Sequence, residues 1–199
     1  MVDVGAKAAT KRVAVAECLV RLGPTLFEAL LRGGLPKGDA LAVARVAGIQ
    51  AAKRTSELIP LCHLLALDYV RIDFEAHEES HSLRVLCEAA TTAGTGVEME
   101  ALTGASTAAL TIYDMGKAVH RGIVVDGLRL LHKEGGRSGL YVADAELAAD
   151  GGEGSARSLT SKHGCEHAHD DLSDLDDLND LDDLSDLDDI SDDAERSER

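Results

Sequence analysis

Four charged side chains stand out in the longest Ala- and Leu-rich stretch of the chain: Glu98, Glu100, Asp114 and Lys117. A helix of this composition packs its small apolar residues inward, where a charge is costly unless it is paired or used in chemistry. Asp114 and Lys117 are three residues apart, so on a helix they share a face and can form a carboxylate–ammonium pair. Such a pair can shift the pKa of each partner and take part in proton transfer. A simple helix salt bridge has the same spacing and is the alternative.

Glu100 and Asp114 lie far apart although both belong to this stretch. Fourteen positions separate them, which is about 21 Å along a straight helix. A small substrate could not easily touch both groups within one chain. Either the two carboxylates do different jobs, or a second subunit brings its Glu100 close to this chain's Asp114.

A lysine lies in a glycine-containing turn, where Lys37 and Gly38 precede Asp39 and a helical pattern over residues 40–53. The free N–H groups of a helix N-terminus and an ammonium group can bind one anion together. An ordinary helix start, capped by Asp39 and with a solvated lysine, explains the same residues. The turn is therefore a candidate anion site with a purely structural alternative.

A thiol and an imidazole are adjacent at Cys62 and His63. Such a pair could form a nucleophilic or metal site. Neighbours in an extended segment point to opposite sides, so we do not expect these two side chains to act on each other. Pro60 stiffens the segment, which favours a role for His63 in contacting a substrate. A buried cysteine beside a polar-facing histidine is the alternative.

Most of the net charge lies in a C-terminal tail. The chain has 20 Lys+Arg and 36 Asp+Glu residues, a net charge of −16, and residues 170–199 hold fifteen of the acidic residues but only two of the basic ones. Leucine or isoleucine recurs there at every third position, which gives neither a helix nor a strand one apolar face. The tail is therefore predicted to be disordered. The His- and Cys-rich segment 163–169 could bind a transition metal, but its flexible surroundings favour weak, opportunistic binding.

The elements that must position the candidate residues alternate between strand and helix patterns. The predicted strands cover residues 11–20, 67–76, 83–90, 123–125, 128–131 and 140–142. The predicted helices cover residues 24–31, 40–53 and 98–119. This order indicates an α+β fold with helices packed on a mainly antiparallel sheet. We expect one domain over residues 1–145 and a flexible linker with the acidic tail over residues 146–199.

Composition also excludes several classes of protein. The chain has no clustered Lys/Arg stripe, so we expect no nucleic-acid binding. It has no apolar run of about 18 residues, so we expect no membrane span, and its first residues do not resemble a signal peptide. Four separated cysteines then favour free thiols in the cytoplasm; they are Cys18, Cys62, Cys87 and Cys165.

Five blocks of sequence occur in an order that resembles a known family. Two of them read Leu58-Ile-Pro-Leu-Cys-His63 and Gly96-Val-Glu-Met-Glu-Ala-Leu-Thr103, and the others cover residues 37–55, 108–118 and 135–139. Over about residues 1–143 the chain is similar to the MoaC family of cyclic pyranopterin monophosphate synthases, which act in molybdenum cofactor biosynthesis. The resemblance does not reach the tail.

The resemblance implies a ferredoxin-like fold and a homohexamer, a trimer of dimers with the active site at the dimer interface. It implies a lyase that converts (8S)-3′,8-cyclo-7,8-dihydroguanosine 5′-triphosphate to cyclic pyranopterin monophosphate and releases pyrophosphate. We expect no redox cofactor and no catalytic metal, although Mg²⁺ could accompany the triphosphate. The alternative is an inactive or regulatory family member that binds metal or protein through its tail.

The resemblance also assigns roles to residues. Asp114 matches the catalytic residue, and Lys37, Lys117 and Lys133 match functional lysines of the family, whose cations must surround the phosphates as the triphosphate cyclises. We group Lys117 and Lys37 with Asp114 as catalytic residues. Arg12 could add to these cations. The residues expected to bind substrate are Leu61, Cys62, His63, Glu98, Met99, Glu100 and Lys133. Among these, the two glutamates can accept hydrogen bonds from the N–H groups of a guanine-type ring.

Three positions depart from the usual family pattern. Leu64 follows Cys-His where the family commonly has proline, and it could shift the loop that carries His63. Gly116 replaces a common cysteine, so we expect a thiol there to be dispensable. Arg137 replaces a lysine, which keeps the charge but changes the hydrogen-bond geometry.

Overall fold

The computed structural model describes residues 1–137, 139–143 and 157–159 of the 199-residue chain. Their elements are β1 (Thr10–Arg21), α1 (Pro24–Leu31), α2 (Ala40–Lys53), α3 (Thr55–Leu58), β2 (Tyr69–His77), β3 (Ser82–Ala93), α4 (Glu98–Gly116), β4 (Val124–Glu134), β5 (Tyr141–Val142) and β6 (Arg157–Ser158). The predicted acidic tail and the His/Cys segment 163–169 lie outside the described residues. None of the described helices is long and apolar enough to cross a membrane.

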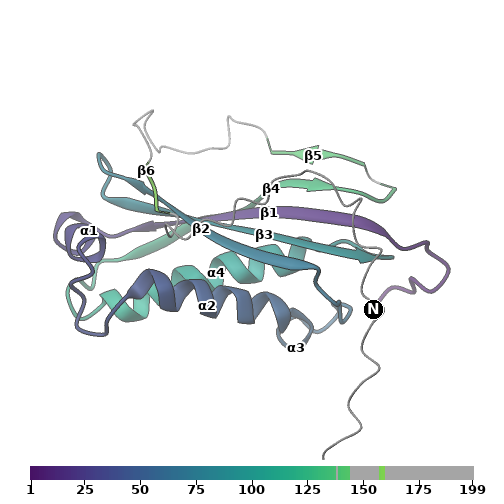
Figure 1. The fold of residues 1–199 in the computed structure, drawn as a ribbon, viewed down its shortest axis with the longest axis horizontal. Coiled ribbons are helices and arrows are strands. Elements are labelled where there is room, and N and C mark those ends of the chain that lie inside the picture. The colour runs from purple at the N-terminus through teal and green to yellow at the C-terminus, as the bar shows by residue number, and fades with distance from the viewer. Residues whose placement is uncertain (138, 144–156, 160–199) are drawn as a thin grey trace, which may run out of the picture. The chain divides into compact units, whose positions relative to one another are not determined.

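The strands form one sheet in the order β5-β4-β1-β3-β2-β6, and every neighbouring pair is antiparallel. The central order β4-β1-β3-β2, with α2 and α4 on the connections, is that of the ferredoxin-like β-α-β-β-α-β arrangement. Helices α2 and α4 cover one face of the sheet (Figure 1). The predicted α+β, ferredoxin-like fold class is confirmed.

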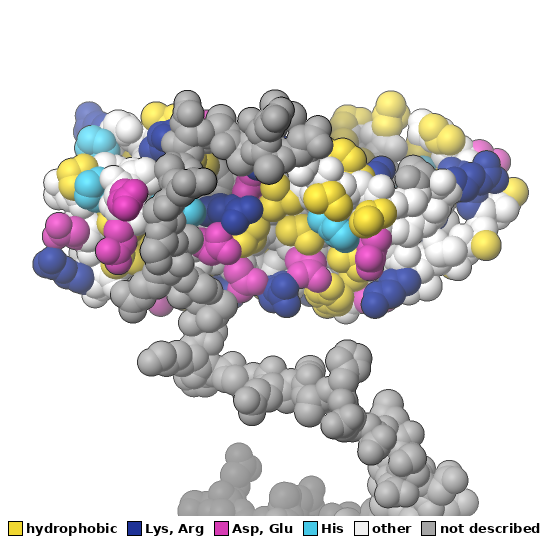
Figure 2. Space-filling model, turned by 90° about the horizontal axis from the view of Figure 1, so that it is seen from above, with side chains coloured by type: hydrophobic (Ala, Val, Ile, Leu, Met, Phe, Trp, Pro, Cys, Tyr) yellow, Lys and Arg dark blue, Asp and Glu magenta, His cyan; other side chains and the backbone are white. Residues whose placement is uncertain are grey.

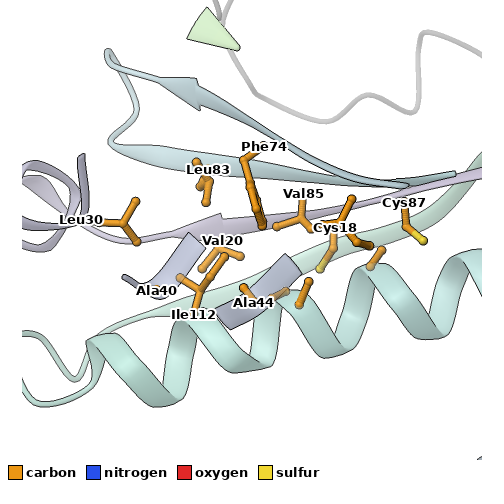
Figure 3. Close-up of a cluster of buried hydrophobic side chains, with 14 of the residues drawn as sticks. Cys18, Val20, Leu30, Ala40, Ala44, Phe74, Leu83, Val85, Cys87 and Ile112 are labelled. Atoms are coloured by element: carbon orange, nitrogen blue, oxygen red, sulfur yellow. The ribbon is translucent and has the colours of Figure 1, made fainter. Parts of the chain in front are cut away.

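The core lies between this face and the two helices. Alternate residues of β1 are buried there, including Ala16, Cys18 and Val20, as the period of a strand requires. Phe74 of β2 and Ile112 of α4 are fully buried in the same layer (Figure 3). Because most of the remaining side chains are small, the core is filled by close approach of the elements rather than by aromatic rings.

Two glycines, one in α2 and one in α4, lie where the two helices pack closely against each other. A Cβ atom on Gly48 would lie 2.9 Å from the carbonyl oxygen of Gly104. A Cβ atom on Gly104 would lie 2.6 Å from Sγ of Cys87 in β3. Both contacts are shorter than a Cβ atom tolerates. The absence of a side chain at these two positions therefore allows α2 and α4 to pack this closely against each other and against the sheet.

The structure differs from the predicted helices and strands in four places. The segments 123–125 and 128–131 are one strand, β4, whose Gly127 has a φ of 63° and lies at a bulge opposite Cys18. Helix α4 ends at Gly116 rather than near residue 119. The four-residue helix α3 was not predicted, and neither was β6, which pairs with Glu75 and Ala76 at the outer edge of β2.

The sheet face opposite the helices carries a row of ion pairs across four strands. Glu17 of β1 accepts hydrogen bonds from Arg84 of β3 and from Arg129 of β4, and Arg84 also binds Glu75 of β2. Figure 2 shows this face, where basic and acidic side chains lie next to one another among apolar ones. The charges of this row are therefore paired with one another within the domain.

Candidate active site

Three candidate catalytic residues meet at the C-terminal end of α4. Nζ of Lys117 lies 2.6 Å from one carboxylate oxygen of Asp114, and Nζ of Lys37 lies 2.6 Å from the other. Lys37 also donates to the Asp114 carbonyl oxygen at 3.2 Å. Asp39 caps α2 by accepting from the Ala42 N–H, which fixes the turn that holds Lys37. The predicted Asp114–Lys117 pair is present, and the anion-site lysine joins it.

This cluster is charged and half exposed. The hydrogen bond from Lys117, and after it the one from Lys37, lowers the pKa of Asp114 to about 2. The hydrogen bond and charge of Asp114 in turn raise the pKa of Lys117. At neutral pH the cluster therefore holds one carboxylate and two ammonium groups, a net positive site suited to a polyanion.

The candidate substrate-binding residues meet at the other end of α4. A pocket of about 380 Å³ opens there between the start of α4, the loop before β2 and the N-terminal segment. Six of the seven predicted substrate-binding residues line it: Leu61, Cys62, His63, Glu98, Met99 and Glu100. The seventh, Lys133, contacts Glu98, with Nζ 2.9 Å from Oε1.

The pKa values of two glutamates in this pocket are shifted in opposite directions. Burial raises the pKa of Glu100 by more than a backbone hydrogen bond lowers it, and the charge of Glu98 raises it a little further. Burial would also raise the pKa of Glu98, but hydrogen bonds from Lys133 and the backbone, with the charges of Lys133 and Arg12, lower it overall. Glu98 is therefore the carboxylate that gives up its proton more readily, and Glu100 is the one that takes up a proton more readily.

Cys62 and His63 have separate surroundings. Burial, followed by the charge of Glu100, raises the pKa of the Cys62 thiol, so this cysteine is a poor nucleophile. His63 points its Nε2 atom at the carbonyl oxygen of Val2, 2.9 Å away. Cys62, like Cys18 and Cys87, is a free thiol.

Some residues of the pocket were not predicted from the sequence. Val2, Val4 and Lys7 come from the N-terminal segment and line the pocket beside His63. Arg12 lines a smaller neighbouring cleft with Glu98 and Lys133.

The three departures from the family pattern have different consequences. Leu64 is 81% exposed, so its side chain does not hold the His63 loop in place. A Cβ on Gly116 would lie 2.8 Å from Cδ2 of Leu26. Leu26 therefore occupies the space that a side chain at position 116 would need. Arg137 lines a cavity with Lys7 and Arg12, which keeps a cation in that loop.

Comparison with known proteins extends these observations. The model described as the MoaC family matches residues 1–136. A cyclic pyranopterin monophosphate synthase of Desulfovibrio desulfuricans is 54% identical over 143 residues, which are 72% of this chain and 88% of the relative. A protein of the same name from Chloroflexus aggregans is 55% identical over 139 residues, 70% of this chain and 84% of the relative.

Proposed function

Because this chain belongs to the MoaC family, we propose that it is a lyase that converts (8S)-3′,8-cyclo-7,8-dihydroguanosine 5′-triphosphate to cyclic pyranopterin monophosphate and pyrophosphate. The observation that carries the proposal is the cluster of Lys37, Asp114 and Lys117. It combines a carboxylate with two cations, as a reaction that moves protons beside phosphate groups requires.

The cluster has a defined part in this reaction. A phosphate oxygen of the substrate competes with Asp114 for the ammonium groups of Lys37 and Lys117. As these hydrogen bonds pass to the phosphates, the pKa of Asp114 rises and the carboxylate becomes a better proton acceptor. Lys117 stays protonated and can donate a proton. Cyclisation forms a new P–O bond at the α-phosphorus and breaks its bond to the β-phosphate, and the lysines stabilise the pyrophosphate that leaves.

The guanine-derived ring binds in the pocket at the other end of α4. Its N–H groups donate to the carboxylate of Glu98, held by Lys133, and to Glu100. The ring is the part of the substrate that needs acceptors, and this pocket contains two. We expect no resident redox cofactor or catalytic metal, with Mg²⁺ bound to the triphosphate itself, and we assign the reaction to the cytoplasm, where nucleoside triphosphates are available.

One substrate can reach both ends of α4 only if two chains share the site. The proposed assembly is a trimer of dimers in which α4 helices of two chains run antiparallel, so that Glu100 of one chain faces Asp114 of the next. Exposed apolar side chains on α2 and α4 support this arrangement: Val43, Val46, Leu110 and Tyr113. A solvent-exposed apolar stripe beside a half-exposed charged cluster fits an interface better than a free surface.

Turnover of the cyclic dihydro-GTP substrate by the full chain tests the function, with pyrophosphate and the cyclic phosphate followed by ³¹P NMR. Absence of both products would refute it. Subunit complementation tests the shared site: Glu100→Gln and Asp114→Asn chains are mixed after the low residual turnover of each alone is measured. A shared site restores about a quarter of wild-type turnover with random pairing, because half of the dimers are mixed and each mixed dimer has one intact site. No recovery in demonstrated mixed dimers would contradict the shared site.

A further inference from the structure

Residues 2–7, here called the N-terminal strap, lie along the pocket beside the histidine loop. Val2, Val4 and Lys7 line the pocket, and Lys7 N–H donates to the Val4 carbonyl oxygen at 3.0 Å in a turn. The strap contacts the pocket's imidazole through its main chain, because the carbonyl oxygen of Val2 lies 2.9 Å from Nε2 of His63. The contact therefore depends on where the main chain of the strap lies, and not on which side chain is present at position 2.

The contact determines which ring nitrogen carries the proton. A backbone carbonyl oxygen can only accept a hydrogen bond, so Nε2 of His63 must be the donor. In the neutral imidazole the other nitrogen, Nδ1, is then unprotonated. Among the described residues Nδ1 has no hydrogen-bond partner, whereas Nε2 is engaged by Val2. Nδ1 is therefore available to accept a hydrogen bond from a ligand.

We propose that the N-terminal strap is a positioning element that holds His63 with Nε2 protonated and Nδ1 as a hydrogen-bond acceptor toward the substrate. An unprotonated nitrogen repels a phosphate oxygen but accepts from an N–H or O–H group. His63 therefore contacts a ring N–H or a hydroxyl of the substrate and can take a proton from it. This role rests on the proposed function, because it assumes that the ring end of the substrate binds in this pocket.

The structure offers a way to move the strap without changing the strap or His63. Gly94 follows β3 directly, and a Cβ atom on it would lie 3.3 Å from the carbonyl oxygen of Lys7 and 3.4 Å from that of Val4. Such contacts are tighter than usual, and the exposed strap can yield to them. Gly94→Ala should shift the strap, and deletion of residues 2–4 removes it. Gly34→Ala is the matched control, because its Cβ would make only an ordinary contact, 3.6 Å from the Ala29 carbonyl oxygen.

The first test needs no substrate. In the ¹⁵N NMR spectrum of the full chain, neutral His63 should show a protonated Nε2 whose proton exchanges slowly with water. Deletion of residues 2–4 should make this exchange fast, Gly94→Ala should accelerate it, and Gly34→Ala should leave it unchanged. A neutral His63 that carries its proton on Nδ1, or an Nε2 proton whose exchange does not respond to the deletion, would overturn the proposal.

The second test measures the consequence for turnover. Deletion of residues 2–4 should lower kcat about tenfold, less than the roughly 10²–10⁴-fold that full loss of a proton acceptor costs, because His63 itself is still present. The Tm of the domain should stay close to that of the full chain. Gly34→Ala, the matched control outside the pocket, should retain kcat. A deletion variant with wild-type kcat would contradict the positioning role. Absence of turnover in the wild-type chain would instead refute the proposed function and leave the NMR result standing.

Discussion

At the N-terminal end of α4, Glu100 is buried and its pKa is raised, whereas at the C-terminal end Asp114 is half exposed and its pKa falls to about 2. The two carboxylates belong to one helix of 19 residues. Their difference comes from their neighbours: Glu100 has lost water and faces Glu98, while Asp114 has two lysines. One helix therefore presents a carboxylate that takes up a proton more readily at one end and, at the other, a carboxylate that two cations keep ionised in the free protein.

This difference matches the two chemical parts of the proposed substrate. The ring end needs hydrogen-bond acceptors in a sheltered pocket, where desolvation strengthens each contact. The phosphate end needs cations that can be reached from solvent and can exchange one anion for another. The partly exposed cluster allows this exchange because a phosphate oxygen can replace the Asp114 carboxylate as the hydrogen-bond partner of both lysines.

The largest expected effect is at the phosphate end. Asp114→Asn keeps the size of the side chain but removes the proton acceptor, so kcat should fall by roughly 10²–10⁴-fold, measured by pyrophosphate release. Asp126→Asn is the matched control, because Asp126 also forms an ion pair, with Arg21 at 2.9 Å, outside either end of α4. A fall of less than tenfold, or an equal fall in the control, would remove Asp114 from the chemistry.

The next effect is at the ring end. Glu100→Gln should lower kcat/KM by roughly 10–100-fold, the loss of one hydrogen bond to a charged acceptor. Glu98→Gln should act mainly on KM, because it also releases Lys133 from its 2.9 Å contact. Steady-state kinetics of both variants separate the two residues. If kcat and KM changed by the same factors in the two variants, Glu98 and Glu100 would not have different roles in the pocket.

The same two glutamates should give opposite pH dependences of stability. The raised pKa of Glu100 means that the folded state binds its proton more tightly, so this residue destabilises the fold progressively as pH rises through the unfolded pKa toward the folded one. The lowered pKa of Glu98 contributes stability above its unfolded pKa, and this is lost as pH falls through the folded value. Urea unfolding of the two Gln variants from pH 3 to 7 checks the signs. Parallel curves for both would contradict these assignments.

The sequence predicts the local part of this site well. The spacing of Asp114 and Lys117 indicates their contact because it depends only on helix geometry. Asp39 likewise predicts the start of α2. The contact of Lys37 with Asp114 spans 77 positions and follows from how α2 seats on α4, which no local pattern contains. The resemblance to a family was the only sequence signal that grouped the three residues.

Two features of the fold show the same limit. Gly127 divides β4 into two apparent strands, because a strand pattern does not reveal that a bulge can carry the chain through a positive-φ glycine. Helix α3 has four residues, too few for a helical period to be visible. The N-terminal segment was missed as part of the pocket because its contact with His63 uses a main-chain carbonyl group, to which side-chain identity gives no clue.

A smaller effect is expected where the two helices cross, between the two ends of α4. Gly104→Ala would place a Cβ 2.6 Å from Sγ of Cys87, and overpacking of this kind costs roughly 1–3 kcal/mol. The free energy of unfolding should fall by this amount, while Gly34→Ala stays near wild type. If Gly104→Ala were neutral, these glycines would not set the spacing of the two helices.

The smallest effect concerns how the two lysines share Asp114. Removal of either ammonium group should raise the Asp114 pKa from about 2 toward its ordinary value, and Lys117→Met should raise it more than Lys37→Met, because the hydrogen bond from Lys117 is the larger cause. A ¹³C NMR titration of the side-chain carboxyl group measures both. Lys53→Met removes a charge at the far end of α2 and should leave the pKa unchanged. A larger shift in Lys37→Met would make the turn lysine the main partner. In that case phosphate binding at Lys37, rather than at Lys117, would release Asp114 to accept a proton.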